Sequence, residues 1–175
     1  MSWLADLWRY GFTAKQRHAS RAAERYAEAI RAYERELAQV PLTEARARAE
    51  GVLAAATQVR VTPADQSAAM QLGHLAPGQQ DVFGRARRVQ ALNGEPYVDA
   101  AEVKPYEWDN RLVQLGLDSE HAYIVARPGE EAVFVVDETE ELNLERAQRF
   151  PSLYHWILWL NRSSELLHEL DEPAA

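Results

Sequence analysis

Apolar positions in the first third of the chain recur with the period of an α-helix. Residues 13–40 contain neither Gly nor Pro, and their larger apolar side chains are spaced by four and three residues: Tyr26, Ile30, Tyr33, Leu37 and Val40. This spacing places them on one stripe of a helix. Pro41 ends the pattern, and a second helix is expected from Thr43, with the stripe Ala45, Ala49, Val52, Leu53 and Ala56. We therefore expect an N-terminal helical hairpin.

Beyond residue 57 the pattern changes several times. Alternation at Val59 and Val61 indicates a short strand, and a weak helix is possible over residues 64–72. The next helix is expected at about Gln79–Leu92, ending at Asn93-Gly94, with the apolar positions Val82, Phe83, Ala86, Val89 and Leu92.

Strand patterns dominate after Gly94. Tyr97-Val98 could pair briefly, and clear strand patterns occupy residues 111–117, 121–126 and 131–137. Pro128-Gly129 joins the last two with residues typical of a tight turn. We therefore expect three consecutive antiparallel strands between Leu112 and Asp137.

The chain should close with a helix over residues 152–170, begun by Pro151 and with apolar Leu153, Trp156, Ile157, Leu160, Leu167 and Leu170. Helices that precede and follow a run of strands indicate an α+β fold, with an antiparallel or mixed sheet flanked by helices. The predicted organisation is an N-terminal helical hairpin segment (residues 1–62), an α+β domain (63–170) and a frayed tail (171–175).

Charge is unevenly distributed along the 175 residues. Residues 1–62 carry 10 Lys and Arg against 7 Asp and Glu, whereas residues 63–175 carry 9 against 20, so the net charges are +3 and −11. The acidic part should repel phosphate backbones, which argues against nucleic acid as a partner and makes a basic protein more plausible. Acidity is also an ordinary route to solubility.

The chain has no recognisable targeting or membrane segment. No uncharged apolar run approaches the length of a spanning helix, and no Cys is present, which fits a reducing compartment. A cluster of apolar residues near the start could lie on a membrane, but the basic face that would hold it there is missing: Trp3, Leu4, Leu7, Trp8 and Phe12. We expect a cytoplasmic protein without stable membrane association.

Motifs for catalysis and for cofactor binding are absent from the sequence. The histidines lack metal-binding spacing, and neither a serine-nucleophile motif nor a glycine-rich phosphate loop occurs. The acidic run at residues 137–145 lacks the pattern of a calcium loop. We therefore predict no catalytic, metal or cofactor site, and rank an enzyme third among the possible functions.

Residues 75–160 resemble the SMI1/KNR4 superfamily, also called SUKH. The similarity comprises Leu75-Ala76-Pro77 before a helix, the Leu115-Gly116-Leu117-Asp118 strand end, the hairpin around Pro128-Gly129 and the aromatic start of the closing helix at residues 150–157. Residues 13–58 depart from the family pattern and could be an addition. Bacterial members of this family are typically immunity proteins, which bind and neutralise a cognate toxin without a cofactor.

The resemblance implies that this chain forms a complex with a toxin. Candidate partner-binding residues are the most acidic positions around the strands and the polar residues at the start of the closing helix: Asp118, Glu120, Glu138, Glu140, Glu141, Tyr154 and His155. For His155 the alternative is a polar position on an otherwise buried helix. The alternative function is an adaptor or self-associating structural protein that uses the N-terminal helical hairpin.

Overall fold

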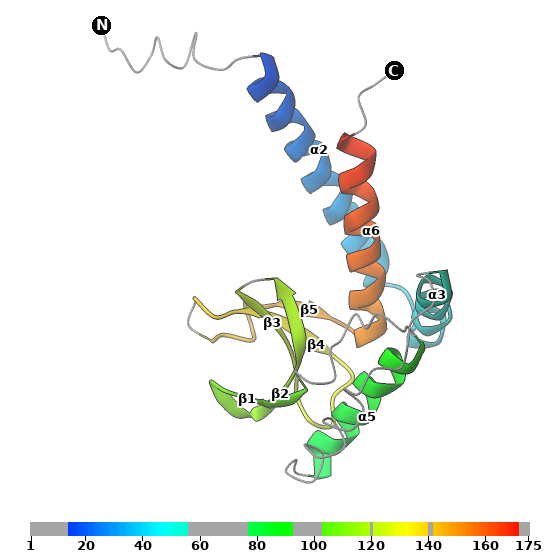
Figure 1. Ribbon diagram of the computed structural model, residues 1–175, viewed down its shortest axis with the longest axis vertical. Coiled ribbons are helices and arrows are strands. Elements are labelled where there is room, and N and C mark those ends of the chain that lie inside the picture. Colours follow the sequence, from blue (N-terminus) through cyan, green and yellow to red (C-terminus); the bar gives the residue numbers. More distant parts are fainter. Residues whose placement is uncertain (1–13, 56–76, 93–102, 120, 140–141, 172–175) are drawn as a thin grey trace, which may run out of the picture. The chain divides into compact units, whose positions relative to one another are not determined.

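The structure is a computed structural model that describes residues 14–55, 77–92, 103–119, 121–139 and 142–171 (Figure 1). Its contacts divide the chain into two compact units. The first unit comprises residues 1–39 and 159–175, and the second comprises residues 40–158. The sequence predicted a boundary between folding segments at residue 62. Whether the segments on either side fold independently is not tested by these contacts, so this boundary stays a prediction.

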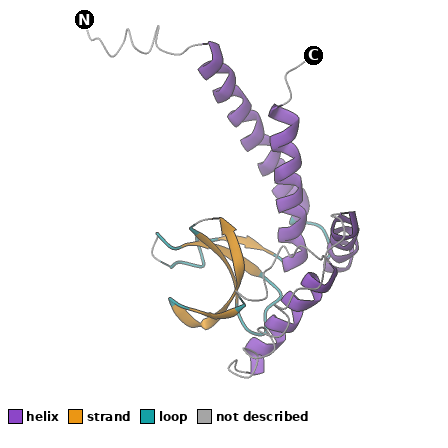
Figure 2. Ribbon diagram, viewed as in Figure 1, coloured by secondary structure: helices purple, strands orange, loops and turns teal. Residues whose placement is uncertain are grey.

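The expected α+β class is confirmed. Helices α2 (Ala14–Leu37), α3 (Leu42–Ala55) and α5 (Pro77–Leu92) precede five strands, and α6 (Leu153–Asp171) follows them (Figure 2). The strands are β1 (Lys104–Tyr106), β2 (Asp109–Ser119), β3 (Ala122–Ala126), β4 (Val133–Asp137) and β5 (Gln148–Phe150). They form one curved antiparallel sheet in sequential order, so the three strands predicted between Leu112 and Asp137 are present.

In the first unit α2 lies beside the C-terminal part of α6 (Figure 1). Ile30 and Leu37 of the predicted stripe are buried. Two polar contacts join the helices: Tyr26 Oη lies 2.5 Å from Ser163 Oγ, and Trp159 Nε1 donates to Glu34 Oε1 at 2.9 Å. Tyr26 and Tyr33 of the same stripe are half-buried, and Val40 lies beyond the end of α2. The predicted stripe therefore has a buried centre at Ile30 and Leu37, with polar contacts beside it.

The apolar stripe of α6 follows a different path from the predicted one. Leu167 is 52% exposed, whereas Leu166 is buried. The buried stripe continues from Trp156 through Ser163 to Leu166, a spacing of seven and three residues that keeps one helix face. Because Ser163 is polar, a prediction based on the apolar residues alone does not find this buried stripe.

The sheet of the second unit is covered on both faces. On one face Tyr106, Leu112, Val125 and Phe134 form a buried cluster, against which Leu142, Leu144 and Ala147 of the β4–β5 connection pack. On the other face Leu115 and Val133 meet residues of α5 and of the start of α6, namely Val82, Val89 and Leu153. The predicted stripes of α3 and α5 are also buried, at Ala45, Ala49, Leu53, Val82, Ala86 and Val89.

The β3–β4 connection confirms the predicted turn. Glu130 N donates to Arg127 O at 3.1 Å across Pro128-Gly129, and Gly129 has φ of 81°. A type II turn requires a positive φ at its third position and often has Pro at its second, and this connection has both.

Two short strands were not predicted. Pro105 in β1 cannot donate to a ladder, and Gln148-Arg149 in β5 carries no β-favouring residue, so pairing rather than propensity places both segments at the sheet edges. The predictions for Val59–Val61, residues 64–72, Asn93-Gly94, Tyr97-Val98 and the N-terminal aromatic cluster lie outside the described residues. Of the tail predicted to fray, Asp171 belongs to α6.

Candidate partner-binding site

The structure separates the predicted site residues into different places. Asp118 lies near the end of β2, Glu138 follows β4, and Tyr154 and His155 lie in the first turn of α6. Glu120, Glu140 and Glu141 lie outside the described residues. The predicted set is therefore not one continuous surface among the residues that can be placed.

His155 is a buried structural residue. It is 1% exposed, and its ring is bonded at both nitrogens: Nε2 donates to Val40 O at 2.8 Å, and Nδ1 lies 2.7 Å from Ser152 Oγ. Ser152 caps α6, since its Oγ also accepts from His155 N at 3.4 Å. A side chain enclosed in this way is removed from the surface that a partner contacts, which corresponds to the alternative interpretation of this residue.

Asp118 also has a structural role. Its Oδ1 accepts a hydrogen bond of 2.8 Å from Nε1 of Trp156, which is 1% exposed. A buried indole N–H needs an acceptor, and Asp118 supplies it at the boundary between the sheet and α6. Tyr154, the neighbour of His155, is half-buried near Arg85 and Glu131 on the helix-covered side of the sheet.

Glu138 is the predicted residue around which a polar cluster forms. Its Oε2 accepts from Tyr123 Oη and its Oε1 accepts from His121 Nδ1, each at 2.8 Å. The backbone fixes this arrangement, because Ala122 pairs with Asp137 in the β3–β4 ladder and Glu138 N donates to His121 O at 2.8 Å. The carboxylate is therefore held in one position at the end of the sheet.

The hydrogen bonds in this cluster shift the acidities of its members. The bond from His121, followed by that from Tyr123, lowers the pKa of Glu138. The hydrogen bond from Tyr123 to Glu138 also raises the pKa of Tyr123, and desolvation of the phenol raises that pKa further. Both shifts favour an ionised carboxylate beside a neutral phenol, so the cluster keeps its negative charge.

A second tyrosine and a second carboxylate belong to the same cluster. The rings of Tyr106 and Tyr123 meet edge to face with centroids 5.7 Å apart. Burial raises the pKa of Tyr106, and the charges of Glu138 and Glu107 raise it further. The charges of Glu107 and Glu138 raise the pKa values of both tyrosines. We therefore treat five residues as one group and call it the acid–tyrosine cluster: Tyr106, Glu107, His121, Tyr123 and Glu138.

Asp137 extends the acidic character of this end of the sheet. Its Oδ1 accepts from the backbone N of Thr139 at 2.8 Å and from the Thr139 hydroxyl at 2.6 Å, and these bonds lower the pKa of Asp137. A pocket of about 330 Å³ lies beside it, between β4 and the connection to β5, with Asn143 and Arg146 in its wall. The carboxylate of Asp137 therefore borders a pocket that also contains an amide and a guanidinium group.

Sequence reasoning missed Tyr106, Glu107, His121 and Tyr123 as members of the site. A usable signal was present for two of them. Once the turn at Pro128-Gly129 is accepted, counting outward along the two strands places His121 opposite Glu138, and Tyr123 two residues along from His121 on the same face of the sheet. For Tyr106 and Glu107 no such signal exists, because β1 itself was not recognised.

We compared the chain with known proteins at the level of families, of single sequences and of solved structures. The chain matches no protein-family model, no curated protein and no solved structure. Within the described ranges no helix combines the length and the apolar composition needed to cross a membrane. In that same part of the chain, no group of three or more His, Asp or Glu side chains is placed to hold a metal ion.

Proposed function

We propose that this chain is a protein-binding module that recognises a basic protein partner through the acid–tyrosine cluster, and that the partner is a toxin which it neutralises, as an immunity protein of SUKH type. The observation that carries the proposal is the position of Glu138. Its carboxylate is fixed by Tyr123 and His121 at the end of the sheet, and the exposed Glu107 directly follows Tyr106, whose ring packs against Tyr123.

Fixed carboxylates are suited to binding a cationic surface. An exposed flexible acid loses side-chain entropy when it pairs with Lys or Arg, whereas Glu138 has lost most of that freedom already. Tyr123 is neutral and donates without cancelling the charge. The net charge of −11 over residues 63–175 adds a long-range attraction that accelerates encounter with a basic protein.

The finer part of the proposal rests on the resemblance of residues 75–160 to the SUKH superfamily. Immunity proteins of that kind act by forming a complex and need no reaction chemistry. This mode of action agrees with a site made of charge and aromatic surface. It also makes the proposal accessible to a simple genetic and biophysical test.

The test uses the protein encoded by the gene adjacent to that for this chain, which the proposal expects to be the toxin. The toxin is co-expressed with the wild type, with a Glu107→Lys/Glu138→Lys variant and with a Glu24→Lys/Glu28→Lys variant, and survival and complex formation are scored. The last variant makes the same charge change at exposed positions of α2. We expect the wild type and the α2 variant to protect, and the cluster variant to associate at least about 10-fold more slowly at low salt.

Each outcome separates a different part of the proposal. A wild type that neither binds nor protects would refute the function. Protection that the cluster variant retains with unchanged association rates would leave the function standing and show that another surface binds. Circular dichroism and the unfolding midpoint of both variants check that the fold is intact, since Glu138→Lys also removes the hydrogen bonds from Tyr123 and His121.

A further inference from the structure

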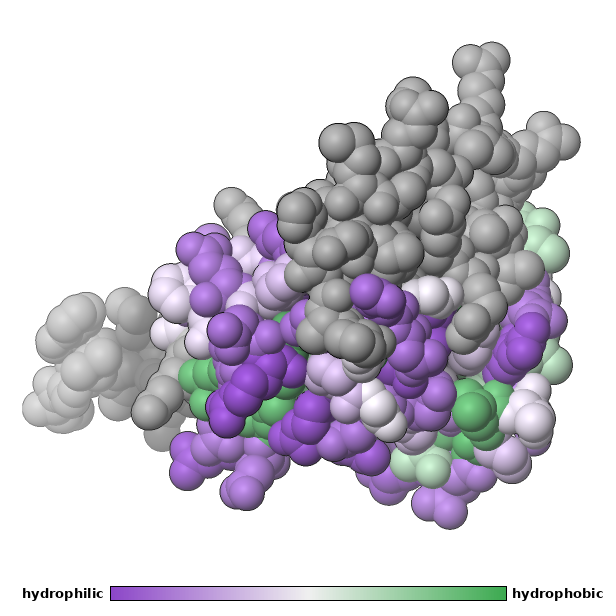
Figure 3. All heavy atoms as spheres, turned by 90° about the horizontal axis from the view of Figure 1, so that it is seen from below, coloured by the Kyte–Doolittle hydropathy of each residue, from purple (hydrophilic) through white to green (hydrophobic). Residues whose placement is uncertain are grey.

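Trp108 is a large apolar side chain presented to solvent. It is 64% exposed, more than Leu42, Leu117 or Leu167, the other large hydrophobic residues exposed in the described part of the chain. On the face drawn in Figure 3 hydrophilic residues cover most of the described surface and hydrophobic ones form small separate areas. Tryptophan is usually highly buried, and it is enriched among the residues that dominate protein interfaces.

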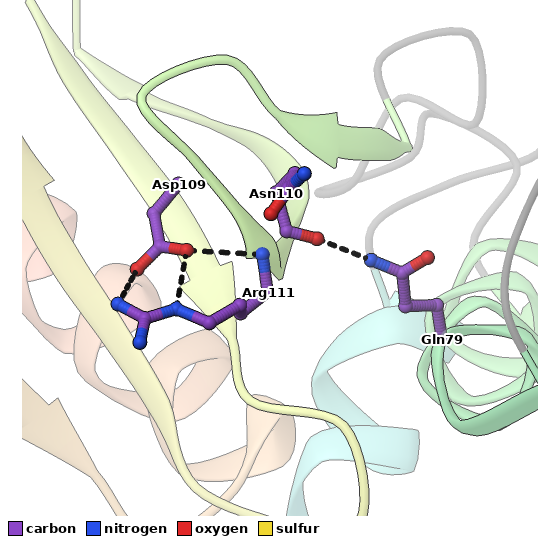
Figure 4. Close-up of polar contacts among 4 residues, drawn as sticks. All are labelled: Gln79, Asp109, Asn110 and Arg111. Carbon is purple, nitrogen blue, oxygen red and sulfur yellow. Dashed lines mark hydrogen bonds and ion pairs between the residues drawn. The ribbon is translucent and has the colours of Figure 1, made fainter.

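The turn that carries Trp108 is short and tightly held. Glu107 and Trp108 form the whole connection between β1 and β2, whose last pair is Tyr106 with Asp109. Directly behind the turn, Asp109 accepts three hydrogen bonds from Arg111: from the backbone N at 3.0 Å, from Nε at 2.9 Å and from Nη2 at 2.8 Å (Figure 4). The carboxylate therefore clamps the first residues of β2.

A buried glutamine anchors the same strand to a helix. Gln79 in the first turn of α5 is 7% exposed, and its Nε2 donates to Asn110 O at 2.9 Å (Figure 4). Together with the Asp109–Arg111 contacts, this bond holds the backbone on the β2 side of Trp108. An aromatic side chain on a rigid support loses little conformational freedom when a partner encloses it, so more of its burial energy reaches the affinity.

The charges around Trp108 indicate what kind of partner fits. Asp109 is matched by Arg111, whereas Glu107, the immediate neighbour of Trp108, forms no ion pair with a described residue. Glu107 is also the member of the acid–tyrosine cluster that lies on this turn. The charge beside the indole that no described residue pairs with is therefore negative, and it belongs to a member of the acid–tyrosine cluster.

We propose that Trp108 is the anchor of the interface: its indole enters an apolar pocket of the partner protein, and a Lys or Arg at the rim of that pocket pairs with Glu107. This inference rests on the proposed function and deepens it. It assigns a different rate to each group: Trp108 slows dissociation of the complex, while the carboxylates of the acid–tyrosine cluster accelerate its association.

The test measures, by surface plasmon resonance, how the protein encoded by the adjacent gene, which the proposed function expects to be the toxin, binds to four full-length proteins: the wild type, Trp108→Ala, Leu167→Ala and Glu107→Gln. Leu167→Ala is the matched control, because it truncates another exposed apolar side chain. We expect Trp108→Ala to raise Kd at least about 30-fold, mainly through faster dissociation. Glu107→Gln should slow association and reduce its salt dependence, and Leu167→Ala should bind like the wild type.

The possible results distinguish the anchor from the function. If the wild type binds and Trp108→Ala binds within about 3-fold of it, the anchor is refuted and the proposed function remains. If the wild type does not bind, the function fails and the anchor with it. Unchanged circular dichroism and an unchanged unfolding midpoint for Trp108→Ala exclude misfolding as the cause of a loss.

Two alternative binding partners of the Trp108 side chain, a membrane surface and a second copy of this chain, are tested with the same proteins. A fluorescence blue shift with phosphatidylcholine or phosphatidylserine vesicles, lost in Trp108→Ala, would replace the protein partner with a membrane surface. A dimer of the wild type that Trp108→Ala dissociates, measured by light scattering, would replace it with a second copy of the chain. Either result would overturn the inference.

Discussion

At the scale of single residues, the buried polar side chains of the second unit differ in how well they are satisfied. Gln79 donates to Asn110 O, and both ring nitrogens of His155 have partners. Gln114, which is 4% exposed, forms no side-chain hydrogen bond with any residue that the structure describes. The strand register places it beside Val125 on the apolar face of the sheet. An unsatisfied buried amide costs stability.

Gln79 and Gln114 are similarly buried, but we expect replacing them with leucine to change the stability of the protein in opposite directions. Gln114→Leu should raise the free energy of unfolding by about 1–3 kcal/mol, because it removes the desolvation cost of an unpaired amide. Gln79→Leu should lower it by about 1–2 kcal/mol, because it leaves Asn110 O without its donor. Urea denaturation of both variants measures the difference, and a loss of stability in Gln114→Leu would show that this amide has a partner in solution.

At the scale of elements, turns and helices use glycine for different reasons. Gly129 has φ of 81°, which an L-residue with a side chain adopts only with strain. Gly51 lies on an exposed position of α3, and a Cβ there would meet no atom within 4 Å. The first glycine is required by the backbone, and the second only weakens its helix.

We therefore expect opposite effects from the same substitution. Gly129→Ala should destabilise the fold by about 1 kcal/mol through backbone strain, whereas Gly51→Ala should stabilise it by about 0.5–1 kcal/mol through helix propensity. Thermal unfolding followed by circular dichroism measures both. Equal shifts of the midpoint in the same direction would contradict the assigned backbone conformation at Gly129.

Elements with strong local patterns could be predicted from the sequence, and elements that depend on pairing could not. The stripe Val82, Ala86 and Val89 and the turn at Pro128-Gly129 were both found where expected. The edge strands β1 and β5 were missed because Pro105 and Gln148-Arg149 carry no strand signal. Their positions depend on the strands beside them.

The candidate site shows the same division. Glu138 could be selected from the sequence because acidic residues are dense there, but the residues that fix it could not, since they meet it only through strand register. His155 was a candidate because it stands among aromatic residues. Its burial depends on Val40, far away in the sequence, and no local pattern reports that contact.

At the scale of the whole molecule, the contacts assign α3 to the second unit rather than to a separate N-terminal segment. Ala45, Ala49 and Leu53 of this helix are at most 1% exposed, and Val40 just before it accepts the hydrogen bond from His155. A chain cut before Val40 keeps these groups. A chain cut at the predicted boundary, just before Pro63, loses all of them.

Two truncations therefore test where the folding unit begins. A protein starting at Val40 should keep the second unit folded, while one starting at Pro63 should unfold with a free energy lower by at least about 3 kcal/mol, since a buried leucine alone is worth 2–5 kcal/mol. Urea denaturation followed by circular dichroism compares them. Equal stability would support the boundary at residue 62 that the sequence suggested.

The sequential order of the strands has a consequence for how fast the sheet forms. Each strand pairs with the next one along the chain, across connections as short as residues 107–108 and 120–121. Closing short loops costs little entropy, and proteins of low contact order fold quickly. The sheet can therefore assemble strand by strand as the chain leaves the ribosome, and each new strand covers the edge left open by the one before it.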